Sequence, residues 1–246
     1  MQKSKICWLR NSEGKLGWSS NPVKGICPMH CKLSNGYEYC YASGERGLYK
    51  RYKWDPTIRF DIEELTEWGK AKPGDMVFVG STIDLFHKDT MEATQWIISH
   101  TRHYLDVIFV FLTKQPQNLA QFKWQGNCWV GATATNLVTF DLATHFLARV
   151  DAKVKFLSIE PLLGRIGYEG LPYADEVLHE GHIDWVIIVQ LTGTQAKKYK
   201  PESKWVEEII KAADEASIPV WTKDNLNWTP ARREKPMRTA KERHEV

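Results

Sequence analysis

The sequence predicts an α/β protein built as a complete or partial (β/α) barrel of the TIM-like kind, with a cysteine loop near its N-terminus. Short apolar runs rich in β-branched residues recur along the chain, and a longer segment with helical spacing follows most of them. Continuous apolar runs are typical of strands covered on both faces, as in parallel sheets with crossover helices. This alternation favours a barrel, and a doubly wound open sheet is the competing arrangement.

Six segments have the length and composition of buried strands, and a weaker candidate precedes Cys27. The six are 76–80, 107–112, 128–132, 154–158, 185–189 and 218–222. Helical spacing predicts helices over 61–70, 91–104, 116–122, 139–149 and 205–216, and a further helix over 41–52. The segment 164–182 is expected to be an irregular insertion or a lid. One domain is expected over 1–246, in which 229–246 is a basic tail.

Composition narrows the class of protein. The chain has 246 residues and a net charge of +3, and its 43% hydrophobic content is ordinary for a protein with a sizeable core. No apolar run reaches bilayer length, and the N-terminus lacks the apolar core of a signal peptide. We therefore expect a cytoplasmic protein with no membrane partner, in a reducing compartment where free thiols persist.

Three of the five cysteines lie within fourteen residues, at Cys27, Cys31 and Cys40. This density fits a metal or iron–sulfur site better than a disulfide framework, which needs an even number of cysteines in a short secreted chain. Three thiolates can hold three irons of a [4Fe–4S] cluster and leave one iron open. Zinc with His30 as a fourth ligand is the alternative, as a closed structural site. Cys7 and Cys128 are expected to be structural.

Basic and aromatic residues are interleaved after the cysteines. The basic residues are Arg46, Lys50, Arg51, Lys53 and Arg59, and the aromatic ones are Tyr49, Tyr52 and Trp54. Such a combination can hold phosphates and stack bases, so nucleic acid is a candidate partner. A solvated helix face is the alternative interpretation of each residue taken alone.

Polar side chains follow every predicted strand. They are Ser81, Asp84, Thr113, Lys114, Thr133, Asn136, Ser158, Glu160, Gln190, Lys223 and Asp224. Ligands bind at the carboxyl ends of the strands in parallel α/β folds, so we expect these side chains to surround one pocket. Each of them alone could instead cap the helix that follows its strand.

Several motifs in this order resemble the radical S-adenosylmethionine (SAM) superfamily, and most closely a phage- and prophage-encoded family within or beside it. They are Asn21-Pro-Val-Lys-Gly, Cys40-Tyr-Ala, Val77-Phe-Val-Gly-Ser-Thr-Ile-Asp-Leu-Phe-His, Phe111-Leu-Thr-Lys, Trp129-Val-Gly, Phe156-Leu-Ser-Ile-Glu-Pro-Leu-Leu-Gly and Asp184-Trp-Val-Ile. The resemblance covers roughly residues 18–228. The Asp-Leu-Phe-His and Leu-Ser-x-Glu-Pro-Leu-Leu motifs are its most specific parts.

The resemblance implies a [4Fe–4S] cluster on Cys27, Cys31 and Cys40, with SAM chelating the open iron. Reduction by a partner such as ferredoxin or flavodoxin would cleave SAM to a 5′-deoxyadenosyl radical that abstracts hydrogen from a substrate. The implied cofactor-binding residues are Tyr41, Ser81, Ser158, Glu160, Gln190 and Gly193. The implied candidates for catalysis are Asp84, Lys114 and Lys223.

Two features depart from the superfamily pattern. Eight residues separate Cys31 from Cys40 where two are usual, and relatives often have a cysteine near the position of Tyr37. The usual Gly-Gly-Glu-Ser-Gly after the fifth strand is replaced by Gln190-Leu-Thr-Gly.

Two other functions remain open on the sequence. One is a non-catalytic nucleic-acid-binding protein with a structural metal site in its N-terminal loop. The other is a barrel hydrolase or lyase that uses Glu160, Lys114 and Asp84 as acid–base groups.

Overall fold

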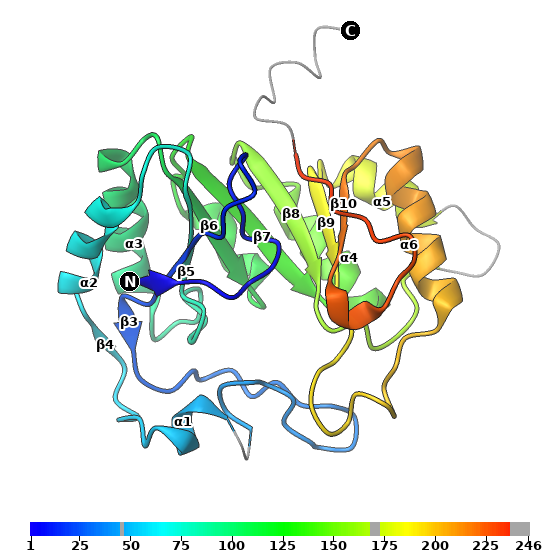
Figure 1. Ribbon diagram of the computed structural model, residues 1–246, viewed down its shortest axis with the longest axis horizontal. Coiled ribbons are helices and arrows are strands. Elements are labelled where there is room, and N and C mark those ends of the chain that lie inside the picture. The colour runs from blue at the N-terminus through cyan, green and yellow to red at the C-terminus, as the bar shows by residue number, and fades with distance from the viewer. Residues whose placement is uncertain (45–46, 168–172, 237–246) are drawn as a thin grey trace, which may run out of the picture.

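The computed structural model describes residues 1–44, 47–167 and 173–236, and its centre is one eight-stranded sheet (Figure 1). In spatial order the strands are β1 (Gln2–Lys3), β2 (Trp18–Ser20), β5 (Met76–Val79), β6 (Ile108–Thr113), β7 (Cys128–Ala134), β8 (Val154–Ile159), β9 (Trp185–Ile188) and β10 (Val220–Thr222). All neighbours from β2 to β10 pair in parallel, and β1 pairs antiparallel with β2 at the edge. The six expected strands are therefore confirmed, and the weaker candidate is β2.

The order of the strands distinguishes the two arrangements that the sequence left open. From β1 to β10 the strands follow one another across the sheet in the order of the chain. A doubly wound sheet needs a point where this order reverses, and the described sheet has none. The sheet is open between its edge strands β1 and β10. The fold is therefore a mixed α/β sheet wound in one direction, which corresponds to the partial form of the expected barrel.

Helices cover one face of this sheet, and we call this the outer face. They are α2 (Glu63–Thr66), α3 (Met91–His100), α4 (Leu137–Leu147), α5 (Tyr173–Glu180) and α6 (Ser203–Glu215), with 3-10 turns at Glu67–Lys70, Thr101–His103, Pro116–Gln121 and Asp224–Leu226. Helix α4 begins with a capping box in which the Asn136 side chain accepts from the Thr139 N–H at 3.1 Å. No helix in the described part of the chain is long and apolar enough to cross a membrane.

Two expectations about helices are corrected. The segment 164–182, expected to be irregular, contains α5, because Ala174 and Leu178 are spaced by one helical turn and both bury against the core. The helix expected over 41–52 is reduced to α1 (Leu48–Arg51), because residues 41–44 form turns; Arg46 lies outside the described residues. Residues 168–172 of the expected lid and 237–246 of the expected tail also lie outside them.

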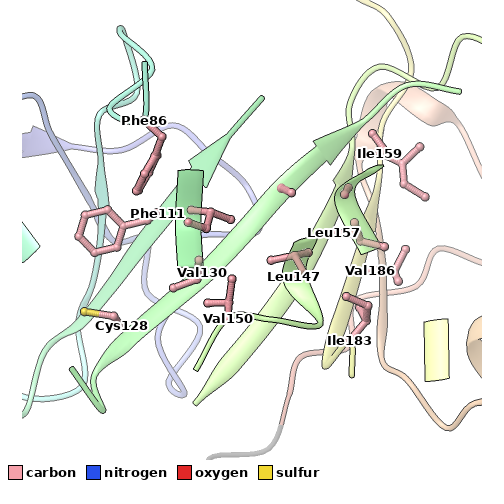
Figure 2. Packing of buried hydrophobic residues seen from close by; sticks show 14 of the residues in the cluster. Phe86, Phe111, Cys128, Val130, Leu147, Val150, Leu157, Ile159, Ile183 and Val186 are labelled. Carbon is pink, nitrogen blue, oxygen red and sulfur yellow. The ribbon is translucent and has the colours of Figure 1, made fainter. Parts of the chain in front are cut away.

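Side chains alternate between the two faces along each strand, as the two-residue period of a strand requires. On the outer face, apolar residues such as Phe111, Val130, Leu157 and Val186 pack against the helices (Figure 2). The opposite face, which we call the inner face, has its own apolar cluster. Its members are Met76, Phe78, Val110, Trp129, Val154, Phe156, Trp185, Ile187, Val189 and Trp221.

The N-terminal segment fills the part of the inner face near the amino ends of the strands. Trp8 and Leu9 are 2% and 0% exposed, and the Trp8 ring packs edge-on against Phe78 and Trp185. This segment lies at the amino ends of the strands, at the top of Figure 1, where the Lys235 ammonium donates to the Arg10 carbonyl. The carboxyl ends therefore form the accessible edge of the sheet, which we call the mouth.

A substitution at Gly131 in β7 tests the packing on the inner face. A methyl group at Gly131 would lie 2.4 Å from Cζ of Phe156, whose ring is fully buried. We expect Gly131→Ala to lower the free energy of unfolding by about 1–3 kcal/mol, because the ring must leave its place. Gly126→Ala is the matched control, since nothing lies within 4 Å of its added methyl. Denaturant unfolding measures both; equal midpoints for Gly131→Ala and the wild type would contradict the packing.

Candidate functional site

The cysteines lie on a loop that is fastened at its base. Strand β3 (Val23–Lys24) leads into the loop and β4 (Arg59–Phe60) leads out of it, and the two pair antiparallel. Gly25 makes this closure possible, because its φ is +114° and an added Cβ would lie 2.7 Å from the Thr57 carbonyl. Between these strands, the described residues 25–44 and 47–58 run along the lower edge in Figure 1, across the mouth. The fold therefore places the three cysteines over the carboxyl ends of the strands.

The eight residues between Cys31 and Cys40 fold into a small hairpin. Lys32 and Glu38 form an antiparallel bridge, and the Leu33 N–H donates to the Tyr37 carbonyl at 2.8 Å. Gly36 takes a φ of +80° in the turn, as an Asn-Gly pair favours. The Tyr39 N–H then donates to the Cys31 carbonyl at 3.1 Å, so the chain returns to Cys31 one residue before Cys40. The long spacing therefore projects outward as a hairpin and leaves its two cysteines close together.

Cys27 is held by two hydrogen bonds from different parts of the chain. Its N–H donates to the Tyr49 hydroxyl at 3.1 Å, and its sulfur accepts from the Asp84 N–H at 3.3 Å. Burial raises the pKa of Tyr49, so this phenol stays protonated and donates in turn to the Thr82 carbonyl. These contacts link Cys27 to α1 and to the loop after β5.

The three thiols lie near enough to one another to interact electrostatically. Burial raises the pKa of Cys31 to about 11; Cys40, Cys27 and Asp84 also raise it, whereas the Lys114 charge lowers it. Burial likewise raises the pKa of Cys27, whereas hydrogen bonds from the N–H groups of Asp84 and Met29 lower it, and the charges of Asp84 and Cys40 add smaller increases. Half-buried thiols of this kind are stable as thiolates only with a bound cation beside them. The donor chemistry therefore fits a metal or an iron–sulfur cluster.

His30 was the candidate for a fourth ligand of a zinc ion. His30 is largely exposed, and its Nδ1 lies 3.4 Å from the Glu38 carboxylate. Among the described residues, no three His, Cys, Asp or Glu side chains converge tightly enough for one ion. A [4Fe–4S] cluster places each thiolate on a different iron, so its ligands are spread more widely than around one ion.

Asp84 connects the loop after β5 to the end of β6. One carboxylate oxygen accepts from the Thr113 hydroxyl at 2.7 Å and the Phe86 N–H at 2.9 Å. The other accepts from the Lys114 N–H at 2.9 Å. Both oxygens are therefore engaged in holding the mouth together, while the N–H of the same residue holds Cys27.

Asn21 plays a similar part beside it. Its side-chain oxygen accepts from the Ser81 hydroxyl at 3.0 Å and from the Thr82 N–H and hydroxyl at 3.1 Å each. The Tyr41 hydroxyl donates to the Ser81 carbonyl. Ser81 and Tyr41 therefore join the cysteine loop to the end of β5.

A polar cluster forms at the ends of β8 and β10. The Glu160 carboxylate accepts from the Lys223 ammonium at 2.9 Å and from the Ser158 hydroxyl at 3.2 Å. The Glu160 and Lys223 side chains are 34% and 27% exposed, so the pair is open to a ligand. Burial raises the pKa of Tyr41, and the charge of the Glu160 carboxylate raises it further. This cluster and the cysteine loop therefore lie at the same mouth.

Next to this cluster are two buried acceptors that have no partner among the residues that the structure describes. They are Oε1 of Gln190 and Oδ1 of Asn225, and the Asn225 amide donates to the Gln190 carbonyl. A buried acceptor without a donor is costly, so this corner suits a ligand that carries N–H groups. Nothing lies within 4 Å of the Cβ position of Gly193, at the start of the next loop.

The structure thus brings most of the expected site residues to the mouth, among them Ser81, Asp84 and Glu160. Asn136 instead caps α4, and Asp224 pairs with Arg233. The other two cysteines lie away from the mouth. Cys128 is buried in β7, where its sulfur lies 3.4 Å from the Thr101 hydroxyl, and Cys7 packs against the inner face.

The sequence did not identify Asn21 as a site residue or the Tyr49 hydroxyl as a support for Cys27. The only sequence feature that pointed to Asn21 is its place at the start of the Asn-Pro-Val-Lys-Gly motif before the first cysteine.

The sheet wound in one direction, with a three-cysteine loop across its carboxyl edge, defines a partial (β/α) barrel with a thiol-lined mouth. A family model described as "Protein of unknown function (DUF5131)" matches residues 3–245, and the chain belongs to that family. No curated protein matches the chain.

Two solved structures of spore photoproduct lyase share the fold. A Cys-to-Ser variant matches with a TM-score of 0.58 at 13% identity, over 90% of this chain and 78% of the lyase. A Tyr-to-Phe variant matches with a TM-score of 0.55 at 12% identity, over 82% of this chain and 74% of the lyase. At this identity the likeness is one of fold.

The Tyr49 hydroxyl offers a direct test of the loop. Tyr49→Phe removes the group that accepts from the Cys27 N–H and donates to the Thr82 carbonyl. We expect the free energy of unfolding to fall by about 1–3 kcal/mol, because two partners lose a hydrogen bond. A protease in native buffer should also cleave the cysteine loop faster in Tyr49→Phe than in the wild type. Tyr52→Phe is the control, since Tyr52 is 59% exposed; if both variants behave alike, Tyr49 does not hold the loop.

Proposed function

We propose that this protein is a radical SAM-type enzyme. The observation that carries the proposal is the cysteine loop. A hairpin brings Cys31 back to Cys40, and the Asp84 N–H ties Cys27 to the same mouth. The fold likeness to spore photoproduct lyase, which is itself a radical SAM enzyme, supports it. The motifs around Cys40, Asp84 and Glu160 support it independently.

In this proposal Cys27, Cys31 and Cys40 hold three irons of a [4Fe–4S] cluster, and the fourth iron is left for SAM. When bound, the cluster supplies the electron that cleaves SAM reductively and so initiates hydrogen abstraction from a substrate. A ferredoxin- or flavodoxin-like reductant would reduce it. The protein's part is to seat the cofactor and to keep water from the mouth.

The polar cluster is the proposed seat of SAM. Glu160 offers a carboxylate to the amino group or to the ribose hydroxyls, and Ser158 supports that carboxylate. The free oxygens of Gln190 and Asn225 offer acceptors for the N–H groups of the adenine, with Gly193 leaving space nearby.

The remaining site residues take different proposed roles. Lys223 and Lys114 carry positive charge toward the SAM carboxylate or the substrate, and Lys114 also acts on Cys31. Tyr41 and Ser81 close the loop beside the adenine. Asp84 is proposed to position Cys27 and the strand ends, because both carboxylate oxygens already accept hydrogen bonds.

These contacts weigh against the two other functions. A zinc staple would need His30 near the thiols, whereas its Nδ1 lies beside Glu38. A hydrolase with Asp84 as its acid–base group would need a free carboxylate oxygen, whereas Asp84 is engaged with Thr113 and two backbone N–H groups.

Iron loading tests the ligand assignment. After anaerobic reconstitution, the wild type should hold about four irons per chain and release 5′-deoxyadenosine from SAM under reduction. Cys31→Ala should lose the cluster and this activity while the sheet stays folded, as circular dichroism would show. Cys7→Ala should load iron normally, because Cys7 packs against the inner face. Full iron content in Cys31→Ala would show that the ligand assignment is wrong.

The role of Glu160 is tested by SAM binding. Glu160→Gln keeps the shape and removes the charge that pairs with Lys223. We expect SAM to bind about ten- to a hundredfold more weakly, as when a hydrogen bond to a charged group is removed. Glu207→Gln on the exposed side of α6 is the control and should bind like the wild type. Calorimetric titration of the iron-loaded proteins gives both values; an unchanged affinity in Glu160→Gln rules out this contact.

A further inference from the structure

Two segments rich in lysine lie on either side of the cysteine hairpin. One is α1 and the residues just after it, and the other is the loop between Gly193 and α6. Their exposed basic residues, which we call the basic rim, are Lys50, Arg51, Lys53, Lys197, Lys198 and Lys200. The two segments are far apart in the sequence, so their meeting at one edge is a property of the fold.

The hairpin joins the two halves of the basic rim. At its tip the Tyr37 hydroxyl lies 3.1 Å from the Thr194 hydroxyl, at the start of the second segment. On its other side is a hollow of 470 Å³ lined by Lys32, Gly36, Tyr37, Glu38 and Lys50. In Figure 1 the loop before α6 descends to the cysteine segment along the lower edge of the molecule. The two halves of the basic rim therefore lie next to the cysteine hairpin, at the edge of the mouth.

The acidic groups beside the hairpin and α1 do not cancel this charge. Glu38 faces His30 at 3.4 Å, and Asp55 pairs with Arg59 at 3.1 Å. Only Asp55 is paired with a cation outside the basic rim, because His30 carries a charge only when it is protonated. Glu38 and the exposed Glu202 therefore remain as two negative charges against the six positive charges of the rim, which leaves this surface positive in balance. A positive surface at a mouth attracts polyanions and concentrates them there.

Aromatic rings accompany the charges. Tyr52 is 59% exposed, and the Arg51 guanidinium lies 5.5 Å from the centre of its ring. In the second segment, the Lys198 ammonium lies 5.5 Å from the centre of the Tyr199 ring. Basic groups that follow a backbone, together with rings that stack bases, are the features of surfaces that bind single-stranded nucleic acid.

We propose that the basic rim binds a single-stranded or locally unpaired nucleic acid, and that this nucleic acid is the substrate presented to the mouth. The lysines contact phosphates, and Tyr52 stacks on an unpaired base. An unpaired strand is required because a base in a duplex cannot present its face to Tyr52. The inference deepens the proposed function by naming its substrate class, and it rests on that function for its chemistry. The binding itself depends only on the surface.

The experiment is a binding titration of the iron-loaded protein with a labelled single strand of roughly 20 nucleotides, longer than one binding site of this kind. It is run at several salt concentrations with the wild type and two fourfold variants. The first removes rim charges: Lys50→Ala, Arg51→Ala, Lys197→Ala and Lys198→Ala. The second removes the same number and kind of charges at the amino ends of the strands: Lys72→Ala, Arg102→Ala, Lys123→Ala and Lys153→Ala.

We expect the wild-type affinity to fall steeply with salt, because bound lysines release counterions from the strand. The rim variant should bind at least about tenfold more weakly, and its logarithmic salt slope should fall by about 0.7 for each phosphate that the protein no longer neutralises. The control variant should bind like the wild type. The inference would be overturned if the wild-type affinity did not change with salt concentration, or if the two variants lost affinity equally.

A second pair of variants tests the stacking. Tyr52→Phe keeps the aromatic face and should bind like the wild type, whereas Tyr52→Leu should bind about fivefold or more weakly. Equal affinities for Phe and Leu, or tighter binding of the matching duplex or of anionic lipid vesicles, would contradict the single-strand assignment. If rim binding fails while iron loading and SAM cleavage succeed, only this inference fails. If the protein holds no iron but the protein as purified still binds the strand, the proposed function fails together with the substrate role, and the basic rim remains a nucleic-acid-binding surface.

Discussion

The hydrogen bonds of Asp84 fix the geometry of the mouth. Its carboxylate accepts from the Thr113 hydroxyl and from the N–H groups of Phe86 and Lys114, and its own N–H donates to the Cys27 sulfur. Hydrogen bonds to a charged acceptor are stronger than neutral ones, and removing one partner leaves a charge unsatisfied. One residue therefore fixes the loop after β5 against the end of β6 and fixes the first cysteine against both.

The rest of the cysteine loop is built outward from that point. Strands β3 and β4 close its base, and Tyr49 holds Cys27 from the side of α1. The hairpin then carries the chain away from Cys31 and back to Cys40, so that a spacing unlike the usual one still yields neighbouring thiols. The loop makes its few fixed contacts with the sheet edge and projects the hairpin toward the basic rim. The proposed cofactor site and one half of the basic rim are in this way parts of one segment.

The strands could be predicted from the sequence because each buried strand is a continuous apolar run bounded by polar and turn-forming residues. The winding direction could not, since it depends on which strands pair. Helix α5 was missed because its segment is short and mostly polar, and Ala174 and Leu178 give only a weak helical pattern of buried residues. The gathering of polar residues at the mouth followed from parallel strands having their carboxyl ends at one edge. The hydrogen-bond partners of these residues could not be predicted, because Asp84 and Ser81 bond to loops whose paths the sequence does not specify.

The most direct test is the electron paramagnetic resonance spectrum of the anaerobically reconstituted, reduced protein, recorded without and with SAM. We expect the spectrum of a reduced [4Fe–4S] cluster, and a change in that spectrum when SAM occupies the open iron. A colourless zinc-loaded protein, or a cluster spectrum that SAM leaves unchanged, would contradict a cluster with an open iron on these three cysteines.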